Sequence, residues 1–162
     1  MGVYDRLIRG LALTGALAFL AAGVLVLADV SLRTLGGVPI RASSALSEYA
    51  LLLGTMAGAP WLVRQKGHIA VTSLVDRLPP GGQRGAGILG AAVSTVTLGV
   101  LAWRAGAIGL DKARSGAVDM RSIAIPEWIA YAILATGFAL MATEFIRLIL
   151  RGDTAPGGEG GV

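Results

Sequence analysis

The residues of this sequence that could do chemistry are a lone histidine and a few acids, and their surroundings argue against catalysis. His68 lies in the segment VRQKGHIAVTSLVDRLPP, residues 63–80. No base, nucleophile or metal-ligand pattern accompanies it, so a structural hydrogen bond or a headgroup contact is favoured. The chain has no cysteine and one histidine, which excludes thiolate chemistry, cysteine-based metal sites and multi-histidine sites. We predict no catalytic residue, no metal site and no cofactor.

Three acids are associated with long apolar runs: Asp29, Glu48 and Glu144. A charge placed in lipid is costly, so an acid in a membrane span suggests a functional site by default. All three nevertheless fall near the predicted ends of the runs. Asp29 can pair with Arg33 at i+4, and Glu144 can pair with Arg147 at i+3. We therefore favour interface or subunit-contact roles for these acids over ion translocation.

Two glycine motifs allow competing interpretations. GAGILG, residues 85–90, has the spacing of a dinucleotide-binding loop, but that loop needs a preceding strand and a βαβ unit. Here PPGGQR precedes the motif and an apolar run follows, which favours a small-residue helix face. GTMAG brings Gly54 and Gly58 into a G-x-x-x-G pattern, which allows close approach of another helix. That second helix could belong to the same chain or to a partner.

The elements that carry these residues are expected to be membrane helices. The chain has 162 residues, of which 54% are hydrophobic and 15% charged, and its mean hydropathy is +0.71. Soluble domains carry about 25% charged residues. Four apolar runs are long enough to cross a bilayer. We predict an all-α integral membrane protein with one domain, residues 1–151, and a flexible tail, residues 152–162. The expected spans cover residues of about 10–32, 45–63, 85–103 and 126–147.

The ends of the expected spans carry helix and membrane-interface signals. Glu48 falls in the first turn of the second span, and Pro126 suits the first turn of the fourth. Trp61, Trp103, Trp128 and Tyr131 resemble an interfacial aromatic belt. No expected span carries an acid or a cation near its midpoint.

A short amphipathic helix is expected between the second and third spans. Val71, Leu74, Val75 and Leu78 follow the spacing i, i+3, i+4, i+7, which predicts one apolar helix face. Such a helix should lie in the membrane interface rather than cross the bilayer.

The charges favour lipid over nucleic acid as their partner. The net charge is +4 and the pI is near 10.1, but the cations sit at the ends of the apolar runs, where lipid headgroups lie. We therefore predict no nucleic-acid binding. Four spans put both termini on one side, and that side has slightly more Lys and Arg residues, which favours cytoplasmic termini.

The chain also resembles a known family. SALSEY runs into LLLGTMAGAPWLVRQKGHIAV, and a later segment reads SIAIPEWIAYAILATGFALMA. Together they resemble the small membrane subunit of tripartite ATP-independent periplasmic (TRAP) transporters, the DctQ family, over roughly residues 4–151. The most specific parts of this resemblance are a Gly-x-His-Ile-x-Val element beginning at Gly67 and an Ile-Pro-x-Trp element ending at Trp128. Thr72 departs from the family, which often has an acid at that position.

The resemblance implies a role within a three-part transporter of the bacterial inner membrane. A periplasmic binding protein captures an anionic solute, commonly a carboxylate, and a large permease subunit carries it with sodium ions. The small subunit supports the large one in the bilayer. The candidate interface or structural residues are Arg33, Glu48, Gly54, Gly58, Gly67, His68, Pro126 and Trp128, and the candidate membrane-interface residues are Trp61, Trp103 and Tyr131.

Two other functions compete with this role. A self-sufficient four-helix transporter that works as a homodimer would need an acid well inside a span, and Asp29 lies too near an end. An intramembrane enzyme would need catalytic groups that the chain lacks.

Overall fold

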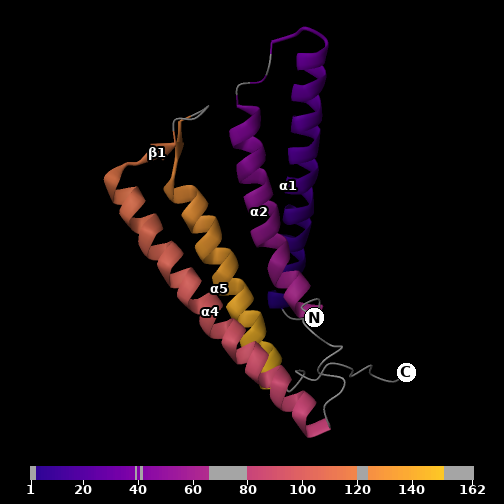
Figure 1. Ribbon diagram of the computed structural model, residues 1–162, viewed down its shortest axis with the longest axis vertical. Helices are drawn as coiled ribbons and strands as arrows, with labels where there is room; N and C mark the ends of the chain where they lie inside the picture. Colours follow the sequence, from indigo (N-terminus) through magenta and orange to yellow (C-terminus); the bar gives the residue numbers. More distant parts are fainter. Residues whose placement is uncertain (1–2, 39, 41, 66–79, 120–123, 152–162) are drawn as a thin grey trace, which may run out of the picture.

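The computed structural model describes residues 3–38, 40, 42–65, 80–119 and 124–151. This part of the chain forms long helices: α1 (Val3–Thr34), α2 (Ser43–Arg64), α4 (Pro80–Ser115) and α5 (Trp128–Arg151). Two short strands, β1 (Val118–Asp119) and β2 (Ile125–Pro126), pair antiparallel in the connection between α4 and α5. Figure 1 shows the arrangement.

The helices α1 and α4 both end at a glycine in the left-handed region. Gly36 has a φ of 74° and Gly116 a φ of 64°, a conformation that costs other residues energy. After α1, the amide of Gly37 donates to the Leu32 carbonyl at 2.8 Å and the amide of Gly36 to the Arg33 carbonyl at 3.4 Å. This is the Schellman arrangement, which satisfies carbonyls that the helix leaves unpaired. The two glycines therefore fix where each hairpin turns back.

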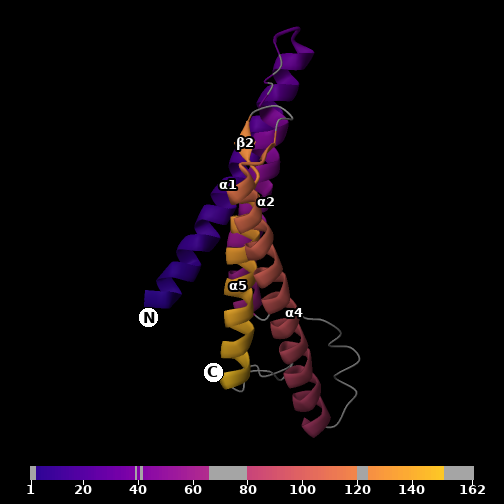
Figure 2. The same ribbon diagram turned by 90° about the vertical axis from the view of Figure 1, so that its left-hand side faces the viewer.

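The helices form a row rather than an enclosed bundle. α1 packs against α2, α4 packs against α5, and the two hairpins meet where α2 contacts α5. The order across the row is α1, α2, α5, α4, as Figure 1 shows, and Figure 2 shows the same helices from the side of α4 and α5. A small buried cluster lies where α2, α4 and α5 meet, formed by Val63, Ala91, Met141 and Phe145. Much apolar surface remains exposed along both outer helices.

Close helix contacts depend on glycine. A Cβ on Gly15 of α1 would lie 2.8 Å from the Gly54 carbonyl oxygen of α2, and a Cβ on Gly137 of α5 would lie 2.7 Å from the Met56 Cβ. Because neither contact leaves room for a methyl group, small residues let these backbones approach closely, as membrane helices require.

The helix boundaries differ in part from the sequence expectation. By length and composition, three described helices could cross a membrane: Tyr4–Thr34, Gly85–Ser115 and Trp128–Arg151. α2, the expected span 45–63, is not among them, because its serines, Glu48 and Pro60 lower its hydropathy. α4 continues beyond residue 103 to Ser115. The expected interfacial helix and the tail lie outside the described residues.

Two predictions about helix starts are wrong. Pro126 belongs to β2 and precedes α5, which begins at Trp128, because the residue pairs with Val118 of β1. Glu48 lies beyond the first turn of α2, because this helix begins at Ser43.

A matched pair of glycine substitutions tests the α1–α2 contact. Gly15→Ala should lower stability by about 1–3 kcal/mol, because the methyl group meets a backbone oxygen that has little freedom to shift. Gly23→Ala on the same helix should not, since a Cβ there has nothing within 4 Å. The midpoint of thermal unfolding in detergent measures both. Equal midpoints would contradict the observed packing.

Candidate functional site

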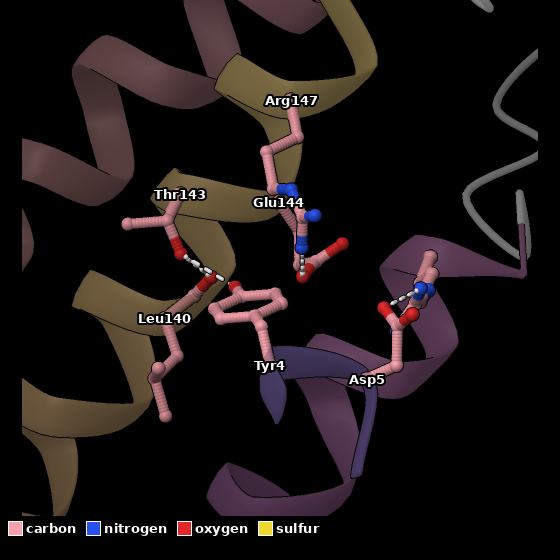
Figure 3. A network of polar contacts seen from close by, with 7 residues as sticks. Tyr4, Asp5, Leu140, Thr143, Glu144 and Arg147 are labelled. Carbon is pink, nitrogen blue, oxygen red and sulfur yellow. Dashed lines mark hydrogen bonds and ion pairs between the residues drawn. The ribbon is translucent and has the colours of Figure 1, made fainter. Parts of the chain in front are cut away.

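Four ion pairs of the described chain lie in two layers, one at each end of the helix row. At the first end, the start of α1 meets the ends of α2 and α5 (Figure 3). We call this group the terminal cluster; its members are Tyr4, Asp5, Arg64, Thr143, Glu144 and Arg147. The cluster joins segments that lie far apart in the sequence, so its geometry is a product of the fold.

The terminal cluster ties α1 to both neighbouring helices. Arg64 of α2 forms an ion pair with Asp5 of α1, and this hydrogen bond raises the pKa of the guanidinium above its ordinary value. Thr143 donates its hydroxyl hydrogen to the Leu140 carbonyl at 2.7 Å. Because a hydroxyl has one hydrogen to give, the Tyr4 hydroxyl is then the donor in its 3.1 Å bond to Thr143.

Glu144 is the most deeply buried member of the terminal cluster. The residue is 4% exposed, and one carboxylate oxygen, Oε1, has no hydrogen-bond partner among the described residues. Arg147 lies 3.7 Å from this oxygen, which confirms the predicted pair, and its guanidinium stacks 4.1 Å from the centre of the Tyr4 ring. The arginine thus neutralises the buried acid while the tyrosine holds the arginine in place (Figure 3).

The second polar layer lies at the end where the hairpins turn. Asp29 is buried and pairs with Arg33 at 2.9 Å, as predicted, while its other oxygen accepts the Ile40 amide at 2.8 Å. Lys112 pairs with Glu127 at 2.7 Å. These contacts fasten each turn to its own hairpin. The four charged groups therefore pair within each hairpin and do not converge on one site.

An open groove lies between α2 and α5 at this turn end. It has a volume of about 570 Å³. Its lining residues are Glu48, Tyr49, Leu52, Asp119, Glu127, Ala130, Tyr131 and Leu134. Among the described residues, no group of three or more histidine, aspartate or glutamate side chains could hold a metal ion.

The structure distributes the predicted site residues over several surfaces. Arg33 is 67% exposed at its side chain, and Glu48 is exposed at the rim of the groove. Gly54 packs against Phe19 and Gly15 of α1, so its helix partner lies in the same chain, whereas a Cβ on Gly58 would meet nothing. Gly67 and His68 lie outside the described residues.

The aromatic residues predicted for the membrane interface lie at different depths. Trp128 opens α5 and is 44% exposed, and Tyr131 lies one turn further on against Gly109 of α4. Trp61 is half-buried near the end of α2. Trp103 is 71% exposed but lies within α4 and not at its end. The segment 85–90 also lies inside α4, where no strand-to-helix phosphate loop can form.

Comparison with known protein families identifies the chain. A family model described as tripartite ATP-independent periplasmic transporters, DctQ component, matches residues 11–155. The chain belongs to the DctQ family. No curated protein and no solved structure matches it.

Membership of the DctQ family has direct consequences. The chain is the small subunit of a TRAP transporter and a multi-pass membrane protein. DctQ proteins work with a large permease and a solute-binding protein, and the family comprises transporter components and not enzymes. The terminal cluster is a set of helix-to-helix contacts within such a subunit.

Analysis of the sequence missed four of the six residues of the terminal cluster. The Glu144–Arg147 pair follows from helical spacing, but Tyr4, Thr143 and the Asp5–Arg64 pair do not. These residues are far apart in the sequence, and no local pattern marks them. The only available signal was an acid before the first apolar run and a base after the second, because a hairpin of two helices brings these ends together.

Substitutions at the buried pair test the role of the terminal cluster. Arg147→Met should lower stability by about 1–3 kcal/mol, because it leaves the buried Glu144 carboxylate without its counter-charge. Adding Glu144→Met should restore most of the loss, since an apolar pair removes the unpaired charge. Thermal unfolding in detergent measures both variants, and Arg151→Met, at the exposed end of α5, is the control. If the double variant is less stable than Arg147→Met, the buried acid has another partner.

Proposed function

We propose that this DctQ protein is the membrane scaffold of its transporter, supporting the large permease during sodium-coupled uptake of an anionic solute, a carboxylate. In this proposal the chain crosses the bacterial inner membrane four times, with α2 as the second span and the amphipathic segment near residues 71–78 in the interface. The large permease and the binding protein select and carry the solute.

The observation that carries the proposal is the single row of helices. A transport pathway through one subunit needs helices on several sides of a central site, and secondary transporters place that site near the midplane, between broken helices. Here α1 touches α2, α4 touches α5, and the row leaves two broad faces exposed. The groove that the helices do form is open and lies near the turns. Such a layer is suited to lie beside another membrane protein.

Helix directions support placing both termini on one side. The contact between Tyr4 and Thr143 brings the start of α1 to the end of α5. The basic residues of that end include Arg64, Arg147 and Arg151, which suits the cytoplasmic side.

The residues outside the described chain keep their proposed role. Gly67 and His68 belong to the element most specific to the family resemblance, and we assign them to the contact with the large permease or to the local structure that supports it. Pro126 and Trp128, at the turn end of the row, are assigned in the same way.

Reconstitution separates the scaffold function from the alternative. We expect this chain to copurify with the large permease, and we expect sodium-driven uptake into proteoliposomes only when both subunits and the binding protein are present. The chain reconstituted alone should give no uptake. Uptake by the chain alone, as a dimer, would establish the self-sufficient transporter instead.

Topology gives an independent test. Reporter domains fused before α1 and after α5 should both report the cytoplasm, because the two helix ends lie together and carry the excess of cations. A reporter placed in the connection between α4 and α5 is the control, and it should report the periplasm. A periplasmic signal from either terminal fusion would contradict the proposed orientation.

A further inference from the structure

The register between α4 and α5 places Arg104 deeper in the helix row than its position just after the expected span 85–103 suggested. A Cβ on Gly109 would lie 3.0 Å from the Tyr131 Cβ, and one on Gly106 would lie 4.0 Å from the Ala135 Cβ. The two helices run antiparallel, so each step back along α4 corresponds to a step forward along α5. Continuing this register places Arg104 at the level of Gly137.

Gly137 lies midway between the two polar layers. Glu127, paired with Lys112, directly precedes α5, and from there to Arg147 in the terminal cluster the chain rises about 30 Å at 1.5 Å per residue. This length equals the thickness of a bilayer core, about 30 Å. Gly137 is halfway along it and packs against Met56, near the middle of α2. A bilayer bounded by the two polar layers therefore has Arg104 near its midplane.

The alternative placement buries more charge. The uncharged run 85–103 of α4, taken alone, would centre the bilayer near the level of Arg147, since α4 begins beyond the end of α5 (Figure 1). The whole terminal cluster, with Asp5, Arg64 and Glu144, would then enter the hydrocarbon. That placement puts four charged side chains in the hydrocarbon, whereas this one puts a single arginine there, so we take the polar layers as the boundaries.

Arg104 has no partner in the described part of the chain. The residue is exposed, on the side of α4 away from Ala105 and Gly109, which are buried toward α5. No described residue forms a hydrogen bond or an ion pair with its guanidinium. An unpaired arginine at the centre of a bilayer is costly, and the headgroups are about 15 Å away, farther than one side chain reaches.

We propose that Arg104 docks onto a carboxylate carried by a transmembrane helix of the large permease, an inference that rests on the proposed scaffold function. The guanidinium offers a planar set of donors that a carboxylate accepts in pairs, and the hydrocarbon offers no competing acceptor. Thr97, Leu101 and Ile108 share its exposed stripe and supply the apolar border of the contact.

Charge complementarity also decides against a second copy of this chain as the occupant. A two-fold dimer centred on this stripe would bring two Arg104 side chains together, because such interfaces oppose equivalent residues. Like charges at the midplane would repel each other strongly in the low dielectric. The docking partner must therefore bring negative charge.

The test measures capture of the large permease, coexpressed and solubilised with tagged variants of this chain. Arg104→Gln should reduce recovery about tenfold or more, and Arg104→Glu at least as much, because each leaves the partner's carboxylate unpaired. Arg114→Gln, in the exposed last turn of the same helix, is the matched control and should leave recovery unchanged. Circular dichroism and gel filtration of each variant alone confirm that it folds.

The outcomes separate this inference from the scaffold function. If the unsubstituted chain fails to capture the large permease, the scaffold function itself is wrong. If that chain captures it and the Arg104 variants do so equally well, Arg104 faces lipid and the inference is overturned. The decisive positive result is rescue: replacing one intramembrane acid of the large permease by arginine should restore recovery with Arg104→Glu and with no other variant of this chain.

Discussion

The close approach of α2 and α5 is the contact on which the rest of the structure depends. α1 packs only on its partner α2 among the helix pairs with extensive contact, and α4 only on α5, so the contact between α2 and α5 is the extensive one that joins the two hairpins. The close approach of α2 and α5 is possible because Gly137 leaves room for the Met56 side chain, which a Cβ on residue 137 would occupy. In a membrane, where apolar surfaces gain little by leaving lipid, such close packing is the main source of helix association.

Polar contacts at both ends of the row complement this central packing. The terminal cluster joins α1, α2 and α5, whereas the turn end holds each hairpin within itself through Asp29–Arg33 and Lys112–Glu127. The hairpins are thus linked at the end that holds the termini and leave a groove at the other. Burying Glu144 against Arg147 and Tyr4 keeps the charged groups together at one level of the helix row.

A helix row of this kind fits the proposed division of labour, in which this subunit supports the large permease. A single layer of helices has area to offer a neighbour but encloses no volume, so the chain is suited to support and the large permease to carry the solute. The exposed apolar surfaces of α1 and α4 are in that case either lipid contacts or docking surfaces. Charge distinguishes the two, because lipid tolerates leucine and valine everywhere but tolerates an arginine at its centre poorly.

The sequence by itself determined the class of protein, the family and the local pairs. Long uncharged runs cannot be accommodated outside a bilayer or a large core, and helical spacing alone brings Asp29 to Arg33 and Glu144 to Arg147. The tertiary structure decided what depends on how separate helices meet. It placed Gly54 against α1, joined Asp5 to Arg64, and excluded Pro126 from α5 through pairing with β1. Above all it set the register of α4 on α5, which moved Arg104 from the end of an apolar run to the middle of the helix row. A run of residues defines its own length, but its depth relative to another helix is determined by the small residues at which the two helices touch.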